Sequence, residues 1–498
     1  MATVRSVATK VPRVVRRFHN SSGGALMWRE LDAWPHEAAH WCRVPKPWQQ
    51  HVDNGAYMLR ASGLVPEDVR AAAAALVSST TFDRDADSVD GLPSHELRWC
   101  REGSYTNVAL EGIFRETIEE RVLPLLRASP LHRGTDLVLC EALVRCYAEG
   151  ERLAHPAHYD ADALVTCVFE VEVGLAGSAR AACARDGNDA AACEAAVAAA
   201  AAAPARGFKG GFYVQPGAHI SSRMPIVMEP GDLVAHSFDL QHGVEVTRGR
   251  RCSVVLWFTD SAASCADKTR PWYAAPAAAG DACAQYNLAK DCTLDDPRAA
   301  LALMTRAAEQ GHFMAQNDLG AMLLEGRGLP GALPDEAAAE RWLRASAGQG
   351  FQRAMVSLAV LESRRGHEAA ALGWLERAAE QKDAEVLFRL GAIYANGWLS
   401  AEADVPRARR LLREAAEQGH PSAMLALGRL LLRLEEPEAA EAAVHWLRRA
   451  AEQGSLEATV ALAKRHASTG EVGAAVRVVA DATRRLTRRS SKWSWTRY

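Results

Sequence analysis

The sequence predicts a multidomain chain: an α+β part, built as a β-sandwich or jelly roll with a helical buttress, and an all-α solenoid of about five helix pairs. The 498 residues exceed one ordinary domain, which holds roughly 100–200 residues. Before residue 259, short β-branched and aromatic runs follow two helical segments. After residue 281, one helical motif recurs along the chain. A boundary is therefore expected between these two parts.

The first 28 residues form a basic segment with no acidic residue before Glu30. Valines recur at near-helical spacing opposite the cations, although Pro12 interrupts the pattern. The segment resembles a mitochondrial presequence, and the apolar stretch of a secretory signal is missing. A mitochondrial location is therefore expected, and a basic tail without a targeting role, on a cytoplasmic protein, is the alternative.

The composition is that of a soluble globular protein. Charged residues make up 24% and hydrophobic residues 49% of the chain, and no apolar run approaches the roughly 20 residues that a membrane helix needs. The net charge of −3 and the pI of about 6.6 provide no basic face for a phosphate backbone. Neither a transmembrane segment nor a nucleic-acid partner is expected, and the oligomeric state stays open.

The cysteine pattern favours free thiols. The chain has 11 cysteines, an odd number, and no C-x-x-C pair. Reduced, mostly buried thiols are therefore expected. Only Cys183 with Cys193 and Cys283 with Cys292 are close enough in sequence to suggest local pairing, and neither pair is predicted to form a disulfide.

Six elements are expected before residue 259. Two helices are predicted at residues 66–79 and 113–128. Four short runs bounded by Gly and Pro predict strands at residues 137–148, 163–173, 210–216 and 252–258. An Ala-rich insert at residues 174–207 belongs to no strand and is expected to be a surface excursion, partly helical or disordered.

Two histidines and two aspartates lie within the stretch LAHPAHYDADAL, residues 153–164. A strand places residues i and i+2 on one face, so His158 and Asp160 can reach the same metal ion. His155 has the wrong parity relative to His158. Asp162 has the right parity but would lie roughly 13 Å from His158 along a strand, too far to bind the same ion. His158 and Asp160 are therefore the predicted ligand pair.

A third ligand is expected from residues 229–258, which contain His236 and His242. His242 is followed nine residues later by Arg251, with Ser253 on the same face of the next strand. Two histidines and one carboxylate form the facial triad typical of non-haem Fe(II) oxygenases, which leaves three coordination positions open. An oxo-acid can fill two positions and dioxygen the third, and an arginine fork suits the far carboxylate of that acid. His236 is expected in the core or beside a ligand.

These residues carry a family resemblance. The stretch ALVRCYAEGERLAHPAHYDADALVTCVFEV, followed by FKGGFYV, EPGDLVAH, QHGVEVTRGRR and LWF, resembles the prolyl 4-hydroxylase branch of the Fe(II)/2-oxoglutarate dioxygenases. The similarity spans about residues 56–258, and residues 29–258 are assigned to this domain. The resemblance implies a double-stranded β-helix (jelly roll) as the fold.

The resemblance also implies a site and its cofactors. Fe(II), 2-oxoglutarate and dioxygen are expected, with ascorbate as a reductant. The implied site residues are the metal ligands His158, Asp160 and His242, the 2-oxoglutarate anchor Arg251 with Ser253, and the pocket residues Tyr147 and Thr166. Arg250 is the alternative anchor. The chain departs from this branch in two extra residues before His158, in LAHP where an aromatic is usual, in the Ala-rich insert, and in an arginine where many prolyl hydroxylases have lysine. These departures weaken the substrate assignment and leave the metal assignment intact.

The second part repeats the motif RAAEQG, or a close variant, at spacings of 39, 32, 37 and 35 residues, with ends at Gly311, Gly350, Lys382, Gly419 and Gly454. A Leu-Gly or Leu-Ala pair follows each motif, and such small residues let neighbouring helices approach closely. A large residue always precedes the second alanine of the motif by five positions and is expected in the core: Leu303, Trp342, Trp374, Leu411 and Trp446.

This pattern resembles the Sel-like repeat of the tetratricopeptide superfamily, over residues 282–486. The resemblance implies a scaffold for protein contacts; the alternative is that the solenoid only stabilises or spaces its neighbour. Residues 259–281, rich in small residues and with two prolines, are expected to be a linker. The basic, aromatic tail 487–498 is expected to be solvated.

Three functions are consistent with these sequence features. The main hypothesis is a 2-oxoglutarate-dependent dioxygenase that hydroxylates an aliphatic C–H, first of all a prolyl residue of a protein or peptide, with a free small molecule left open. The second is an inactive oxygenase-fold scaffold whose repeats mediate protein contacts. The third is a zinc hydrolase that uses the H-E-x-x-H match at residues 36–40. A chance match on a helix surface is preferred there, because only the presequence-like segment precedes it.

Overall fold

The computed structural model describes twelve parts of the chain: residues 18–19, 25–26, 29–30, 39–46, 56–80, 82–86, 93–148, 154–171, 208–292, 295–399, 401–434 and 437–481. Within the basic segment 1–28, only the paired strands β1 (Phe18–His19) and β2 (Ala25–Leu26) belong to them. The Ala-rich insert 174–207, with Cys183 and Cys193, and the tail 487–498 lie outside the described residues. The predictions for these segments stay predictions.

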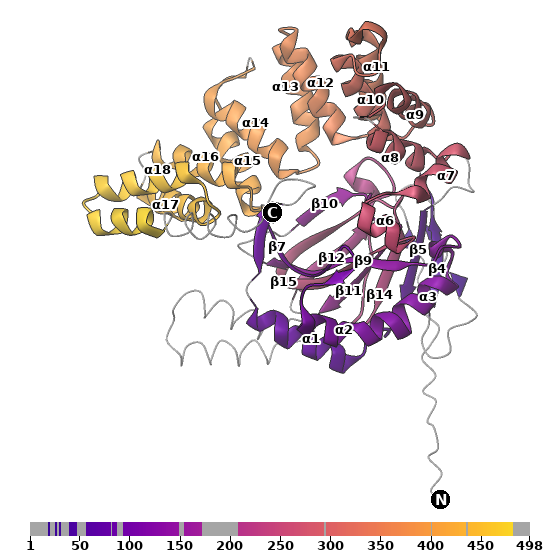
Figure 1. Cartoon of the computed structure of the whole chain (residues 1–498). Coiled ribbons are helices and arrows are strands. Elements are labelled where there is room, and N and C mark those ends of the chain that lie inside the picture. Colours follow the sequence, from indigo (N-terminus) through magenta and orange to yellow (C-terminus); the bar gives the residue numbers. More distant parts are fainter. Residues whose placement is uncertain are drawn as a thin grey trace, which may run out of the picture.

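The first part of the chain is an antiparallel sheet domain, and a helical repeat region follows it (Figure 1). Nine strands of the sheet form one continuous path, in the order β3–β4–β5–β14–β11–β15–β9–β7–β6. Their bounds are β3 Arg29–Glu30, β4 Ala39–Val44, β5 Ala56–Ala61, β14 Leu233–Ser237, β11 Val165–Val171, β15 His242–Thr259, β9 Val138–Ala148, β7 Pro93–Arg101 and β6 Asp83–Ala86. The four predicted strand runs fall within or overlap β9, β11, β12 and β15.

Strand β15 connects this sheet to a second layer. Its first half pairs with β10 (Ala154–His158) and β12 (Phe208–Val214), and β12 also pairs with β13 (Met224–Pro225). Its second half pairs with β11 and β9. A single 18-residue strand therefore belongs to both layers. An apolar cluster that includes Met58, Val168 and Phe212 fills the space between them.

The opposite face of the main sheet packs against helices. These are α1 (Glu67–Ser79), α2 (Val108–Thr117) and α3 (Leu123–Ala128), with a π-helical turn joining α2 and α3. Phe169 of β11 is buried with its ring against Phe114 of α2, and Leu256 of β15 belongs to the same buried cluster. Both predicted helices are confirmed, but the second begins before residue 113. Asn107 caps its first turn by accepting from the Leu110 N–H at 3.1 Å, a signal that the sequence analysis missed.

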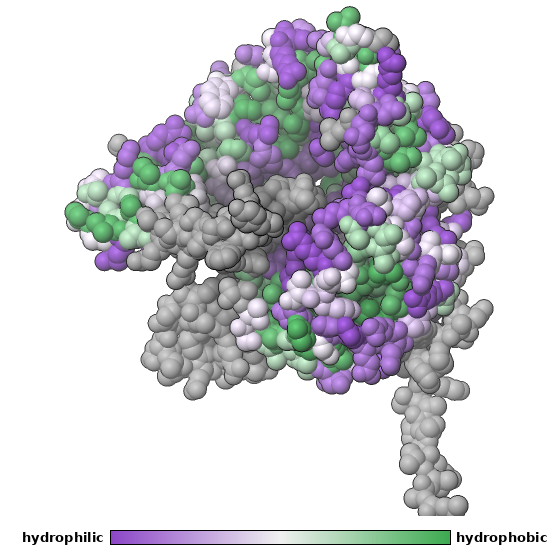
Figure 2. Space-filling model, viewed as in Figure 1, coloured by the Kyte–Doolittle hydropathy of each residue, from purple (hydrophilic) through white to green (hydrophobic). Residues whose placement is uncertain are grey.

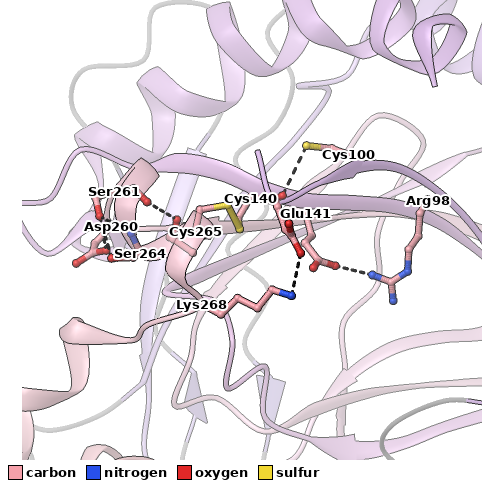
Figure 3. The surroundings of a disulfide bond; sticks show 11 residues. Arg98, Cys100, Cys140, Glu141, Asp260, Ser261, Ser264, Cys265 and Lys268 are labelled. Carbon is pink, nitrogen blue, oxygen red and sulfur yellow. Dashed lines mark hydrogen bonds and ion pairs between the residues drawn. A yellow bond between two sulfur atoms is a disulfide. The ribbon is translucent and has the colours of Figure 1, made fainter. Parts of the chain in front are cut away.

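Two disulfides correct the expectation of reduced cysteines. Cys146 of β9 is bonded to Cys252, directly across the ladder on β15. Cys140 of β9 is bonded to Cys265 of α6 (Figure 3). The partners are 106 and 125 residues apart in sequence, so only the fold reveals them. The expectation of free thiols holds for five others, Cys42, Cys100, Cys167, Cys283 and Cys292.

Peptide mapping under non-reducing conditions should recover both cross-linked pairs, Cys140 with Cys265 and Cys146 with Cys252. Reduction should release them together with a fall in stability of about 2–4 kcal/mol for each bond. A digest in which all four cysteines are alkylated without reductant would contradict this pairing. Because disulfides persist in oxidising compartments, their recovery from native material would also weigh against a cytoplasmic location.

The segment 259–281, predicted as a linker, connects the two parts but is folded. It contains α6 (Ala262–Asp267), a 3₁₀ turn (Pro271–Tyr273) and α7 (Ala274–Ala278). Trp272 and Tyr273 are buried in the core of the sheet domain, and the Tyr273 hydroxyl donates to the Ala161 carbonyl. Apolar burial, which composition alone did not reveal, therefore fixes the connection against the sheet.

Eleven described helices from residue 282 to residue 468 form a solenoid of antiparallel pairs: α8 Ala282–Cys292, α9 Pro297–Glu309, α10 Phe313–Glu325, α11 Glu336–Gly348, α12 Gln352–Arg364, α13 Glu368–Ala379, α14 Ala384–Asn396, α15 Val405–Glu417, α16 Pro421–Leu432, α17 Pro437–Glu452 and α18 Leu456–Ser468. Helical residues continue at 472–481. The solenoid arches over the end of the sheet domain that carries β10 (Figure 1). Hydrophilic residues dominate the visible surface of both parts, with smaller hydrophobic patches (Figure 2).

The repeated motif explains how neighbouring repeats are joined. Its glutamine side chain donates to a backbone carbonyl in the motif of the preceding repeat, at 2.7–2.9 Å: Gln349 to Gly311, Gln381 to Gly350, and Gln418 to Lys382. The large residues precede the motif as predicted and contact the core. A Cβ at Gly320, Gly391 or Gly428 would come within 2.7–2.8 Å of a leucine on the next helix. The predicted close approach of helices at Leu-Gly is therefore confirmed.

Replacing Gly391 with alanine should lower the free energy of unfolding by about 1–3 kcal/mol, because the new methyl group would overlap Leu412 at 2.8 Å. Gly373 of α13 is the matched control, since a Cβ there meets no atom within 4 Å. Gly373→Ala should stabilise by about 0.5–1 kcal/mol. Denaturant unfolding followed by far-UV circular dichroism compares the two, and equal effects would contradict the tight packing at Gly391.

Candidate metal centre

Three side chains meet where β10 and β15 face each other. His158 ends β10 and pairs directly with His242, the first residue of β15. Asp160 follows in the loop after β10, and its two oxygens lie 3.3 Å from His158 Nε2 and 3.4 Å from His242 Nε2. The ligand atoms of the three residues lie within 4.8 Å of one another. The structure thus brings together the three residues predicted as metal ligands, although β10 ends before Asp160.

Backbone carbonyls orient the two imidazoles. Nδ1 of His158 lies 2.9 Å from the Pro156 carbonyl, and Nδ1 of His242 lies 3.2 Å from the Leu240 carbonyl. Because a carbonyl only accepts, each Nδ1 carries the proton and each Nε2 is left with its lone pair toward Asp160. Such outer contacts fix the ring orientation of a metal-binding histidine. His155, which had no predicted role, is buried with its Nδ1 3.1 Å from that of His158.

Thr166 and His236 lie just outside the three ligand side chains. The Thr166 hydroxyl donates to Asp160 Oδ2 at 2.7 Å. Thr166 was predicted to line the co-substrate pocket, and in the structure it contacts one of the candidate metal ligands. His236 of β14 is fully buried, with its ring centroid 4.1 Å from that of His242 and its ring stacked on Phe212. His236 therefore lies beside a ligand, as expected.

Burial and mutual charge set the protonation of the centre. Burial alone would raise the pKa of Asp160, but the neighbouring His242 and His158 hold it well below its usual range. The pKa of His242 lies well below its usual value because burial disfavours the imidazolium and because His236 is close. Burial also lowers the pKa of His236. An ionised carboxylate and neutral imidazoles are the forms that bind a metal.

Arg251 of β15 lies deep in the sheet domain and is 1% exposed. Its Nε donates to Glu170 Oε1 at 3.0 Å and its Nη1 to Ser253 Oγ at 3.2 Å. Its Nη2 has no partner among the described residues. Glu170 had no predicted role. Its parity with Thr166 on β11 is visible in the sequence, but its position opposite Ser253 follows only from the β11–β15 register. The Glu170 carboxylate therefore already occupies part of the Arg251 guanidinium.

The side chains next to Arg251 point to different faces of the main sheet. Tyr147 of β9 lies directly opposite Arg251 in the ladder, and its buried side chain joins the apolar cluster between the two layers. Arg250, the alternative anchor, has its Nη2 3.8 Å from Cys146 Sγ, a residue of the helix-covered face. Successive strand residues point to opposite faces, so only Arg251 shares a face with Ser253.

The H-E-x-x-H match does not form a helix in its described part. Ala39 and His40 begin strand β4, and His40 pairs with Arg60 of β5. The expected helix surface is therefore wrong here, and residues 36–38 lie outside the described residues. Across the part of the chain that the structure describes, His158, Asp160 and His242 form the sole group of three or more metal-ligating side chains close enough to share an ion. Asp162 pairs with Arg270 at the surface, in line with its exclusion as a ligand.

The model of the Sel1 repeat matches five segments of the chain, residues 284–312, 313–351, 368–383, 384–420 and 421–455. These five segments of the solenoid are Sel1 repeats. Repeats of this kind mediate protein contacts, which supports the predicted protein partner. No curated protein matches the chain. None of the described helices has the length and apolar character that crossing a bilayer requires.

Solved structures resemble one part or the other. A protective antigen of uropathogenic Escherichia coli with an SLR fold is 23% identical over 44% of this chain, with a TM-score of 0.37, and the match spans 49% of that antigen. A Sel1 repeat protein from Oxalobacter formigenes is 24% identical over 43% of this chain and 91% of its own, with a TM-score of 0.36. An oxidoreductase of the 2OG-Fe(II) oxygenase family from Burkholderia pseudomallei is 17% identical over 41% of this chain and 84% of its own, with a TM-score of 0.29.

Proposed function

We propose that the chain is an Fe(II)/2-oxoglutarate-dependent dioxygenase of the prolyl 4-hydroxylase-like branch, with the sheet domain as its double-stranded β-helix. Its substrate would be an aliphatic C–H of a protein or peptide, first of all of a prolyl residue. The observation that carries the proposal is the convergence of His158, Asp160 and His242, of which His242 is buried and the other two are half-buried. Arg251, whose Nη2 has no partner among the described residues, lies on the same strand as His242.

The donor set fits Fe(II). Two neutral imidazole nitrogens and one carboxylate are the ligand types of non-haem iron oxygenases, which keep three further positions for co-substrates. Bound there with 2-oxoglutarate and dioxygen, iron would supply the oxidation that converts a C–H into a C–OH, with release of succinate and carbon dioxide. Ascorbate would serve as a reductant.

The residues of the chain would bind 2-oxoglutarate and orient the metal ligands. Arg251 would hold the distal carboxylate of 2-oxoglutarate, with the Ser253 hydroxyl beside it, since a guanidinium fork matches a carboxylate. Thr166 would fix the Asp160 carboxylate by its hydrogen bond of 2.7 Å. Tyr147, opposite Arg251 in the ladder, would close the pocket wall and exclude water.

Succinate formation tests the proposal. The purified full chain, supplied with Fe(II), ascorbate and 2-oxoglutarate under air, should form succinate slowly even without substrate. His158→Ala should reduce this to background. His40→Ala, a histidine of β4 outside the centre, is the matched control and should keep wild-type turnover. A folded, iron-loaded wild type that binds no 2-oxoglutarate and forms no succinate would refute the proposed dioxygenase activity.

One observation favours a second function. The Glu170 carboxylate already bonds to Arg251, the group that the co-substrate needs. If Glu170 excludes 2-oxoglutarate, the sheet domain would be an inactive scaffold and the Sel1 repeats would carry the function through protein contacts. Binding of 2-oxoglutarate to the iron-loaded chain separates the two functions.

A further inference from the structure

A large cavity lies between the candidate metal centre and the repeats. It has a volume of about 1230 Å³, with His158 and Asp160 in one wall. The opposite wall belongs to the start of α12 and to the turns before α14 and α16, including Gln352, Lys382 and Gln418. In Figure 1 the repeats correspondingly arch over the β10 end of the sheet domain. A molecule that fills this cavity contacts both parts of the chain.

The cavity is larger than a small substrate needs. Sites for small molecules usually have volumes of about 300–1,000 Å³. A second groove, of about 730 Å³, lies on the repeats and shares six lining residues with the cavity: Lys290, Gln352, Arg353, Asp383, Glu385 and Arg389. Together they form one cleft that runs from α10 to the metal centre. This length suits an extended chain segment better than a free amino acid.

Two buried amides in the cavity wall each leave one polar atom unpaired. Gln241, beside His242, donates from Nε2 to the Ala157 carbonyl at 3.3 Å, but its Oε1 accepts nothing from the described residues. Nδ2 of Asn287 on α8 likewise finds no acceptor in the described part of the chain. Each unpaired buried group costs roughly 1–3 kcal/mol. A peptide backbone offers both missing partners, an N–H for Gln241 and a C=O for Asn287.

Positive charge without an ion-pair partner lies beside Asn287. Lys290 and Arg353 are exposed and line both the cavity and the groove. Neither forms a salt bridge with an acidic side chain of the described residues, whereas Arg389 on the same wall is paired with Glu385. A concave surface concentrates such a field. Asp318 and Asp383 also line the groove, but their carboxylates already accept hydrogen bonds, from Tyr286 and Asn317 and from the backbone at the start of α14. Lys290 and Arg353 therefore favour a ligand that places a negative group beside them.

We propose that this cleft binds an extended, acidic segment of a protein. An acidic residue of the ligand sits on Lys290 and Arg353, and Gln241 and Asn287 hold its backbone on the way to the metal centre. Only the hydroxylation of that segment rests on the proposed function; its binding does not. The repeats then select the substrate, and the sheet domain acts on it.

Selection from a random peptide library tests this proposal with the full chain and no 2-oxoglutarate. Selected sequences are synthesised as peptides of about ten residues, which extend over about 35 Å. Their affinities for the wild type and for Lys290→Glu/Arg353→Glu are measured by fluorescence anisotropy. The matched control is Arg341→Glu/Arg410→Glu, the same charge change at exposed positions outside cavity and groove. All four side chains are exposed, so both double variants should keep wild-type thermal unfolding.

We expect acidic peptides to be enriched, with affinity reduced at least about tenfold in the cleft variant and less than about twofold in the control. Peptides without acidic residues, equal losses in both variants, or failure to select any peptide would overturn the proposal. Binding of acidic peptides without succinate formation would leave this inference standing and refute only the proposed enzyme.

Discussion

Replacing Arg251 with leucine should weaken 2-oxoglutarate binding by about 100-fold or more and leave Fe(II) binding close to that of the wild type. Hydrogen bonds to charged groups contribute about 1.5–3 kcal/mol each, and a carboxylate held by a guanidinium fork loses two of them. Water cannot replace them, because the Arg251 side chain is buried. Calorimetric titration without dioxygen measures the affinity, and metal analysis of the same samples measures the iron.

Glu170 provides the control for this experiment. Arg251→Leu leaves the Glu170 carboxylate without its partner at 3.0 Å, which lowers stability for reasons unrelated to 2-oxoglutarate. Arg251→Leu/Glu170→Gln removes that charge, so its Tm should recover while its affinity stays low. Glu170→Gln alone should strengthen 2-oxoglutarate binding, because one negative charge beside the incoming carboxylate is lost. Wild-type affinity in all three variants would exclude Arg251 as the anchor.

Two of the three candidate metal ligands could be predicted from local spacing, whereas His242, far along the chain, was assigned through the family resemblance. His158 and Asp160 are two residues apart, and the H-x-D spacing brings their side chains together even though β10 ends at His158. Arg251 and Ser253 share a face for the same reason of strand parity. Glu170 escaped notice because its partner is 81 residues away and only the β11–β15 register aligns them. The disulfides escaped for the same reason, since Cys146 meets Cys252 only across a ladder.

The repeats and the segment 259–281 also differ in how far the sequence alone predicts their structure. The repeats could be predicted in register, because the residues that pack one repeat against the next recur in every motif. Examples are Gly391, which faces Leu412, and Gln381, which is bonded to the preceding turn. The segment 259–281 looked like a linker because small residues and prolines carry no periodic signal. Its structure depends on Trp272 and Tyr273 meeting the core of the sheet domain, which is a contact between distant residues.

Such a distant contact also joins the two parts of the chain, and its loss should have the largest effect on stability. Lys46, just after β4, is buried, and its Nζ lies 3.0 Å from Asp239 Oδ2 and 3.2 Å from Cys283 Sγ on α8. Lys46→Met should therefore lower the free energy of unfolding by about 3–5 kcal/mol, because it leaves Asp239 buried without its main counter-charge. Denaturant unfolding measures this loss.

A double-mutant cycle separates this pair from general damage to the core. Asp239→Asn should cost a similar amount, while Lys46→Met/Asp239→Asn should recover part of the loss, since no unpaired charge then stays buried. Arg127, whose partner Asp136 is exposed, gives the matched surface control, and Arg127→Met should change stability by less than about 1 kcal/mol. Losses from Lys46→Met and Asp239→Asn that simply add would show that the two side chains do not interact.

The same pair predicts how stability depends on pH. Burial alone would raise the pKa of Asp239, but Lys46 and then Arg133 lower it to about 2, below the ordinary value of 3.8. A carboxyl with a depressed pKa stabilises the fold above its ordinary pKa and loses this contribution as pH falls through the folded value. The wild type should therefore lose stability between about pH 4 and pH 2 more steeply than Asp239→Asn. Identical acid-unfolding curves for the two proteins would show that the ionised Asp239 carboxylate, paired with Lys46, does not contribute to the stability of the fold.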